Sequence, residues 1–335
     1  MRNLYLSNLP VSYRMDFYRS LHRELGCEIC FQQAGPDFPG RLWTLRNLPA
    51  LVKEFRPSMV FVPEFSAAAL LCLSLGKRYG FKVISCCDDS LDMIQGHDFG
   101  WKHRLAREIV PRLVDGLILH SPEVRDRYRS RFGKGFFMPI IADERRIGPE
   151  LQRVLPLSVQ LRPGKEPLVG FVGRLVGLKN VPTLLRAFVP LKDRARLVLV
   201  GEGEERTALE ALSRELGLDV LFTGWLEGDT LLAWYNLLDI LVLPSTQEAY
   251  GAVTGEALMA GAKVVVSRKA GSSGLVREGE NGYCVEPDDE SGLTERIGLL
   301  LDAVPAGRSL TRRENLLPFR FESCMQELIN EINML

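Results

Sequence analysis

The chain has 335 residues, of which 25% are charged and 46% are hydrophobic, and its 42 Lys and Arg residues equal its 42 Asp and Glu residues. This length predicts about two domains, and the neutral balance gives no global field that would favour nucleic acid. Residues 1–160 carry 23 Lys and Arg against 17 Asp and Glu, and residues 161–335 carry 19 against 25, so the first half is basic and the second acidic.

The seven cysteines indicate a reducing compartment. Their number is odd, and they include the adjacent Cys86 and Cys87 and a Cys27-x-x-Cys30 pattern inside an apolar run, which is poor material for a disulfide framework. No second pair or nearby histidine completes a metal site at Cys27 and Cys30, and we expect no metal. We also expect no signal sequence and no membrane span, because no apolar run approaches about 18 residues.

Strands and helices alternate along the first half of the chain. This pattern predicts a doubly wound parallel sheet. The expected strands lie at residues 4–6, 27–31, 59–62, 82–86 and 116–119. The expected helices lie at residues 15–26, within 44–55, and at 66–79, 101–113 and 123–132.

A second series of strands begins after residues 141–166, where the periodicity fades and a linker is predicted. Its strands are expected at residues 168–172, 197–200, 220–222, 239–243, 263–266 and 283–285. The sequence therefore predicts an α/β protein of two Rossmann-like lobes whose parallel sheets face a central cleft. The predicted domains are residues 1–150 with 319–335, and residues 160–318, with the last helix crossing back to the first lobe.

Two carboxylates frame one predicted helix start in the second lobe. Glu248 follows the strand at 239–243, at the carboxyl end where open α/β sheets bind ligands. Glu256 lies about two helical turns further on. The unpaired N–H groups of a helix start suit an anion, and the carboxylates suit hydroxyl groups. This pattern indicates a ligand in which a phosphate group lies beside a sugar.

A cationic loop opens the second lobe. Gly173 permits close backbone approach at a strand end, and Arg174 and Lys179 bracket the loop that follows. An Arg fork and a Lys point charge form a sensible clamp for a diphosphate, although two solvated surface cations are the alternative. The segment 201–204 resembles a dinucleotide fingerprint, but Arg206 takes the third glycine position, so we expect no nicotinamide site.

Together these features resemble the donor lobe of family 4 of the GT-B glycosyltransferases, over about residues 168–300. The motifs that carry the resemblance are Gly173-Arg174-Leu175 with Lys179, Val200-Gly201-Glu202-Gly203, Phe222-Thr223-Gly224, Leu243-Pro244-Ser245, Glu248 with Gly251, Glu256-Ala257 and Gly279-x-Asn281-Gly282. The first lobe matches only in architecture.

The resemblance implies a retaining glycosyltransferase that holds a nucleotide-sugar donor without a metal or other cofactor. Arg174 and Lys179 would bind the diphosphate. The backbone around Gly173 and the N–H groups of Gly251, Ala252 and Val253 would also contact the donor. Glu256 would accept hydrogen bonds from the ribose, and Glu248 from the donor sugar.

Three departures from the family pattern bear on the chemistry. Many relatives have a histidine after the fourth strand of the first lobe, where this chain has Asp88 and Asp89. We expect Asp88 either to stabilise positive charge on the sugar ring or to cap a helix. Gly274 stands where the family often has Glu, which indicates a different sugar contact or reduced activity. Residues 7–10 replace the common Gly-Gly of the first-strand loop, so acceptor chemistry does not carry over.

The family implies an acceptor that is a glycan, a lipid-linked glycan or a small molecule, in the cytoplasm of a bacterium that builds surface polysaccharide. The basic residues of the first lobe favour contact with an anionic inner-leaflet surface, or else form a solvated helix face. The alternatives to transfer are a nucleotide-sugar hydrolase or epimerase of the same fold, and a non-catalytic nucleotide-sugar-binding subunit.

Overall fold

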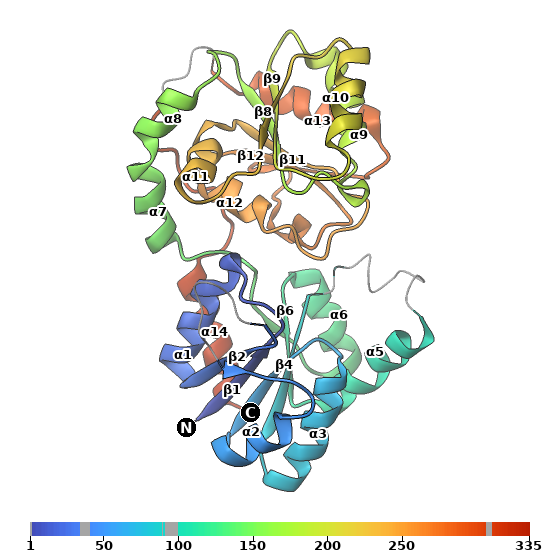
Figure 1. The fold of residues 1–335 in the computed structure, drawn as a ribbon, viewed down its shortest axis with the longest axis vertical. Coiled ribbons are helices and arrows are strands. Elements are labelled where there is room, and N and C mark those ends of the chain that lie inside the picture. The colour runs from blue at the N-terminus through green and yellow to red at the C-terminus, as the bar shows by residue number, and fades with distance from the viewer. Residues whose placement is uncertain (1, 34–40, 89, 91–99, 306–309) are drawn as a thin grey trace. The chain divides into compact units, whose positions relative to one another are not determined.

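The computed structural model describes residues 2–33, 41–88, 90, 100–305 and 310–335. The chain divides into two compact units (Figure 1). The first unit is Met1–Ala142 with Phe321–Leu335, and the second is Asp143–Arg320. Each contains one sheet in which the paired strands run parallel. The predicted α/β architecture of two Rossmann-like lobes is therefore confirmed.

The first unit is built on a seven-stranded sheet in the order β3-β2-β1-β4-β5-β6-β7. Its strands are β1 (Asn3–Ser7), β2 (Cys27–Phe31), β3 (Arg41–Leu42), β4 (Met59–Pro63), β5 (Lys82–Cys87), β6 (Gly116–Leu119) and β7 (Phe136–Phe137). Its helices are η1 (Ser12–Arg14), α1 (Met15–Leu25), α2 (Leu48–Phe55), α3 (Ala67–Tyr79), α5 (Trp101–Leu113), α6 (Pro122–Phe132) and α14 (Phe321–Asn333). The central strands are buried on both faces, as continuous apolar runs predict.

The last helix, α14, belongs to the first unit although the second unit precedes it in the chain. It packs against α1 and β7. Its buried Phe321, Met325, Leu328 and Ile332 recur at helical spacing and form one apolar face. Glu331 on the same helix accepts a hydrogen bond from Arg129 at 2.7 Å.

The second unit is built on a six-stranded sheet in the order β10-β9-β8-β11-β12-β13. Its strands are β8 (Leu168–Val172), β9 (Arg196–Val200), β10 (Val220–Gly224), β11 (Ile240–Leu243), β12 (Lys263–Ser267) and β13 (Gly282–Val285). Its helices are α7 (Glu144–Arg153), α8 (Leu155–Leu161), η2 (Gly177–Lys179), α9 (Val181–Phe188), η3 (Val189–Leu191), α10 (Arg206–Glu215), α11 (Gly228–Leu237), α12 (Val253–Met259), η4 (Gly271–Leu275) and α13 (Glu290–Asp302).

The prediction of a linker at residues 141–166 is wrong, because this segment forms α7 and α8 and packs against α11. The helices escaped prediction because Pro149 interrupts the apolar periodicity of α7. Buried Leu151 anchors α7, and the Asn236 side chain donates to its carbonyl oxygen at 2.8 Å. The first unit therefore ends at Ala142 rather than at residue 150.

The strand order reverses once in each sheet. In the first unit the reversal lies between β1 and β4, and in the second between β8 and β11. In open parallel sheets the loops diverge at such a switch point, and ligands bind at the carboxyl ends of the two strands. The topology therefore indicates one candidate ligand-binding position in each unit.

Candidate functional site

The cationic loop and the first carboxylate meet at the switch point of the second unit. Arg174 and Lys179 follow β8, whereas Glu248 follows β11. The two strands are hydrogen-bonded neighbours (Figure 1). The sheet thus brings together residues that lie about 70 positions apart, as the sequence predicts.

Glycines hold the loop after β8 against the loop after β9. The N–H of Gly173 donates to Val200 at 2.9 Å, and the N–H of Leu175 donates to Glu202 at 2.8 Å. A Cβ atom at Gly201 would overlap the carbonyl group of Gly173. The glycines therefore serve a close approach of two loops, which fixes the backbone that carries Arg174.

Lys179 and Glu248 form an ion pair across the switch point. Their side chains are only 19% and 15% exposed, so the pair is largely shielded from water. Arg174 is exposed, and its side chain makes no hydrogen bond or ion pair with any residue that the structure describes. One cation of the predicted clamp is thus open to a ligand, and the other is neutralised by a carboxylate.

The segment before α12 offers unpaired backbone donors. Gly251 has a φ of +89°, a conformation that favours glycine. Its carbonyl oxygen accepts from Thr254 at 3.1 Å and starts the helix. The N–H groups of Gly251, Ala252 and Val253 donate to no described residue, as expected at a helix start. Gly251 and Ala252 end the loop that also carries Glu248, and Val253 is the first residue of α12.

Glu256 is held by a tyrosine that the sequence did not reveal. Tyr235, buried in α11, donates its hydroxyl hydrogen to Oε2 of Glu256 in α12. Burial raises the pKa of Glu256, and the Tyr235 hydrogen bond and the charge of Arg146 oppose this effect. Tyr235 precedes Glu256 by 21 residues, on another helix, and no sequence spacing marks the pair.

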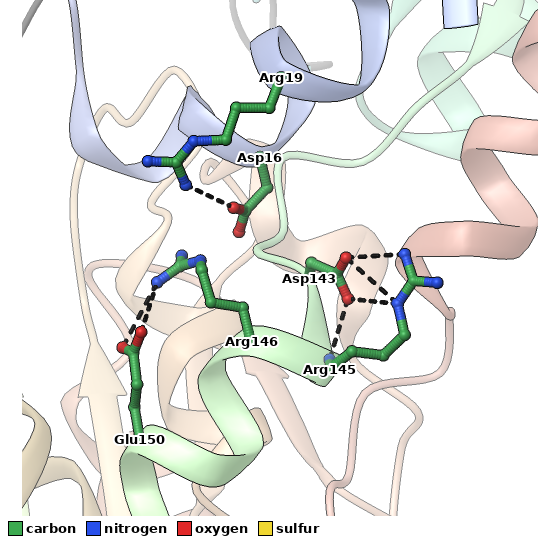
Figure 2. A network of polar contacts seen from close by, with 6 residues as sticks. All are labelled: Asp16, Arg19, Asp143, Arg145, Arg146 and Glu150. Atoms are coloured by element: carbon green, nitrogen blue, oxygen red, sulfur yellow. Dashed lines mark hydrogen bonds and ion pairs between the residues drawn. The ribbon is translucent and has the colours of Figure 1, made fainter. Parts of the chain in front are cut away.

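The start of α7 supplies the Arg146 charge that acts on Glu256. Figure 2 shows Arg146 donating to Glu150, with Nη1 of Arg146 3.2 Å from Oε1 of Glu150. Beside it, Asp143 caps the helix by accepting from the N–H of Arg145 at 2.9 Å. The same figure draws a separate contact within α1 of the first unit, between Arg19 and Asp16. The α7 contacts fix the helix that packs beside α12.

The loop after β12 is tied to the Glu248 loop. The N–H of Gly271 donates to the carbonyl oxygen of Glu248 at 3.2 Å, and the N–H of Ser272 donates to Tyr250 at 2.7 Å. The hydroxyl groups of Ser272 and Thr254 lie 2.9 Å apart. Gly274, the position where the family often has Glu, is buried in η4.

Asp88 in the first unit belongs to a charged network at the carboxyl ends of β5 and β6. Its Oδ1 accepts from Arg14 and lies 3.0 Å from Nε2 of His120. Nδ1 of His120 lies 2.6 Å from the carbonyl oxygen of Met138, so this nitrogen donates. Burial raises the pKa of Asp88, but Arg14 and His120 outweigh it and hold the pKa well below its usual range. Asp89 lies outside the described residues.

A pocket of about 180 Å³ lies at the switch point of the first unit. Its lining comes from the carboxyl ends of β1, β4 and β5, from the residues that follow these strands, and from η1 and α1. The polar side chains among them include Ser7, Asn8, Arg14, Glu64 and Asp88. The network around Asp88 therefore forms part of the wall of a polar pocket.

The cysteines form no redox or metal centre among the described residues. All seven are free thiols, six of them buried. Burial raises the pKa of the Cys30 thiol to about 11, which keeps it protonated. No three His, Cys, Asp or Glu side chains within the described ranges gather as a metal ion would require.

Among the helices that the structure describes, none has the length and apolar character of a membrane span. This finding concerns spanning helices alone.

The second unit is similar in sequence to known glycosyltransferases. Residues 166–303 match the model of the family described as glycosyl transferases group 1. An uncharacterized glycosyltransferase of Methanocaldococcus jannaschii is 38% identical over 140 residues, 41% of this chain and 36% of that protein. The GDP-mannose-dependent alpha-(1-6)-phosphatidylinositol monomannoside mannosyltransferase of Mycolicibacterium smegmatis is 28% identical over 71% of this chain and 66% of that protein.

The match to a solved structure covers both units. The crystal structure of Anabaena HepE in complex with UDP superposes with a TM-score of 0.81 at 17% identity, over 100% of each chain. The chain spans less than two thirds of the length of the curated relatives named above. The chain therefore has the GT-B fold, and residues 166–303 of its second unit match the glycosyl transferases group 1 family.

Proposed function

We propose that the protein is a retaining glycosyltransferase that moves a sugar from a nucleoside diphosphate donor to a hydroxyl group of an acceptor. One observation carries the proposal. An open cation at Arg174, the Lys179–Glu248 ion pair and the unpaired N–H groups of residues 251–253 all lie on the loops after β8 and β11. These are the donors and acceptors that a diphosphate joined to a sugar would need.

Each group has a role in donor binding. Arg174 and Lys179 bind the diphosphate from one side, and the N–H groups of residues 251–253 bind it from the other. Lys179 then exchanges its carboxylate partner for a phosphate oxygen, which leaves Glu248 to accept hydrogen bonds from the donor sugar. Glu256, oriented by Tyr235, accepts from the ribose hydroxyl groups.

In the proposed step, the bond from the anomeric carbon to the diphosphate oxygen breaks. The acceptor oxygen forms its bond on the same face of the sugar. Negative charge grows on the leaving oxygen, so Arg174 and Lys179 stabilise the transition state more than the bound donor. The leaving phosphate takes the proton of the acceptor hydroxyl, and no dedicated protein base is needed. The two cations supply this stabilisation, so we propose that the reaction is independent of a metal.

The comparisons support a nucleotide sugar as the donor. The solved structures of HepE hold UDP and, separately, UDP-glucose. The mannosyltransferase of M. smegmatis is named for GDP-mannose and a phosphatidylinositol mannoside. We propose by analogy a glycan or lipid-linked acceptor, used in surface polysaccharide synthesis at the cytoplasmic face of a membrane.

The first unit supplies the acceptor side in this proposal. Its polar pocket at the β1–β4 switch point has room for a small part of an acceptor. Asp88, whose carboxylate pairs with Arg14 and lies beside His120, is the acidic group of this pocket that would accept a hydrogen bond from an acceptor hydroxyl group.

A transfer assay tests the proposal. The protein is incubated with UDP-, GDP- and ADP-sugars and acceptors extracted from cell envelopes, and the anomeric configuration of the product is read by NMR coupling constants. We expect one donor to be consumed with retention, and Glu248→Gln to slow transfer at least 100-fold. An inverted product would refute retention.

Other outcomes of the same assay identify the alternatives. Free sugar released at the same rate without acceptor indicates a hydrolase. A changed sugar still attached to the nucleotide indicates an epimerase. Binding of a donor with no turnover on any acceptor indicates a non-catalytic binding subunit.

A further inference from the structure

Glu64 has a backbone conformation that a glutamate rarely adopts. Its φ is +48°, in the left-handed region where a Cβ atom is strained and glycine is favoured. Among the residues that the structure describes, Arg56 and Asn180 are the other non-glycine residues with a positive φ. Both follow the last residue of a helical segment, where a left-handed residue is ordinary. Glu64 ends no helix, because it directly follows strand β4.

The neighbouring strand β5 holds the backbone of Glu64 in place. The N–H of Glu64 donates to the carbonyl oxygen of Cys86 at 2.7 Å. The carbonyl oxygen of Glu64 accepts from the buried hydroxyl group of Ser85 at 2.7 Å. A strained residue persists only where its surroundings fix it in this way, and such residues gather at binding and catalytic sites. The conformation of Glu64 therefore indicates a functional role.

Glu64 is exposed and lines the pocket at the switch point of the first unit. Asp88, the other carboxylate of the lining, already accepts from Arg14 and lies beside His120. A carboxylate accepts hydrogen bonds at both of its oxygens and donates none. Glu64 is therefore suited to a ligand that offers two neighbouring hydroxyl groups.

The same pocket has apolar walls. Leu9 and Tyr13, which are 47% and 40% exposed, line it together with the buried Tyr5 and Tyr18. Apolar surface beside a few hydrogen-bonding groups matches a sugar ring, which has apolar C–H groups and polar hydroxyl groups. The volume of about 180 Å³ is smaller than the about 300–1,000 Å³ of most ligand pockets, so the pocket suits one ring rather than several.

The charges of the pocket favour a neutral ligand. Its charged lining residues are one cation, Arg14, and two carboxylates, Glu64 and Asp88, a formal balance of −1. Arg14 is paired with Asp88, so it does not offset the charge of Glu64. The Glu64 carboxylate would repel a phosphate group on the ligand, whereas it would attract the hydroxyl hydrogens of a neutral ring.

From these observations we propose that Glu64 recognises the acceptor by accepting hydrogen bonds from neighbouring hydroxyl groups of an uncharged terminal sugar. Tyr13 packs against the C–H face of the same ring. The acceptor is then a glycan whose last sugar carries no phosphate. The inference rests on the proposed glycosyltransferase function and names the class of its acceptor.

Ligand-observed NMR tests the proposal on the whole protein without a donor. The probes are the methyl glycosides of glucose, galactose, mannose and N-acetylglucosamine, each compared with the same glycoside phosphorylated at C6. We expect one glycoside to bind and its phosphorylated form to bind at least fivefold more weakly. Glu64→Gln should weaken binding of that glycoside about 10-fold, by the loss of charge from the hydrogen bonds. Equal or tighter binding of the phosphorylated form, or no effect of Glu64→Gln, would overturn the proposal.

Glu64→Gly separates binding from folding. Glycine relieves the left-handed strain, so this variant should melt no lower than the unaltered protein and yet bind the glycoside at least 10-fold more weakly. The matched control is Arg56→Gly, which relieves the same strain at the end of α2 and should leave glycoside binding unchanged. If Glu64→Gly lowers the melting temperature and leaves binding unchanged, the carboxylate serves the start of helix α3 instead, and the proposal is wrong.

Transfer kinetics and donor titration distinguish this proposal from the proposed function. Glu64→Gln should raise the KM for the glycoside acceptor and leave the affinity for the nucleotide sugar unchanged. Binding of a nucleotide sugar without binding of any glycoside would overturn the acceptor proposal alone. Glycoside binding that Glu64→Gln weakens, without binding of any nucleotide sugar, would refute the donor function and still assign Glu64 to sugar binding.

Discussion

Replacing Tyr235 with Phe removes one hydroxyl group and tests how Glu256 is held. The hydroxyl donates to Oε2 of Glu256, and the Tyr235 side chain is only 1% exposed. A hydrogen bond to a charged group contributes about 1.5–3 kcal/mol. Water cannot readily replace this donor, so we expect Tyr235→Phe to destabilise the second unit by about 2 kcal/mol at pH 7.

The pH dependence of this loss follows from the pKa of Glu256. Burial raises that pKa, and the Tyr235 bond lowers it, so Tyr235→Phe moves the pKa higher still. An ionised, partly buried carboxylate needs the bond more than a neutral one. The destabilisation should therefore be greatest above the folded-state pKa and shrink toward about 1 kcal/mol as the pH falls and Glu256 becomes protonated.

Hydrogen exchange of the β11 and β12 amides is the assay, because it reports the second unit without the first. Glu256→Gln and the double variant complete a cycle, and we expect a coupling energy of about 1.5 kcal/mol between the two sites. Donor affinity should fall in both single variants, because Glu256 loses either its charge or its orientation. Additive effects within about 0.3 kcal/mol would refute the account of this pair.

Three further perturbations test other parts of the account. Gly251→Ala places a methyl group 2.6 Å from a side-chain carbon at the end of β11 and strains a φ of +89°. We expect the free energy of unfolding to fall by about 2 kcal/mol and donor binding to weaken. The control Gly217→Ala has open space around it and should lower the free energy of unfolding by only about 1 kcal/mol. Lys179→Met and Glu248→Gln should each cost about 1–2 kcal/mol in urea unfolding because each leaves a shielded charge alone, and a double variant as unstable as their sum would contradict this. Asp88→Asn should destabilise the first unit by about 2 kcal/mol between pH 5 and 8, because the pKa of Asp88 is depressed. This loss of stability should shrink below about pH 4. A loss that stays constant with pH down to 2 would rule out the ionised network.

Strand periodicity predicted most of the fold. The long apolar strands and the helices between them lie within a few residues of their predicted positions, since each carries a strong periodic signal. The short edge strands β3 and β7 have two residues each and show no periodicity. The helices α7 and α8 were mistaken for a linker because prolines interrupt their patterns.

Part of the candidate site could be predicted from the sequence, because its residues follow strands. Glu248 comes after β11 and Lys179 after β8, and parallel strands bring their carboxyl ends to one edge. Their mutual ion pair was not predicted, since the sequence suggested separate contacts to the donor for each of them.

Two partners escaped prediction for different reasons. Tyr235 reaches Glu256 from a neighbouring helix, and its place depends on helix packing that no local pattern encodes. His120 could have been found, because it directly follows β6 as Asp88 follows β5, and the two strands are neighbours. Strand order, once assigned, would have placed the histidine beside the carboxylate.

The central claim is that the switch point of the second unit binds a nucleoside diphosphate sugar. Calorimetric titration with UDP-, GDP- and ADP-sugars tests it most directly, with Arg174→Ala as the variant and Arg214→Ala, an exposed arginine on α10, as the matched control. We predict that one donor binds with one site per chain and that Arg174→Ala weakens binding about 10- to 100-fold, by the loss of a charge-assisted hydrogen bond. Absence of binding by every nucleotide sugar, or equal affinity in Arg174→Ala, would contradict the claim.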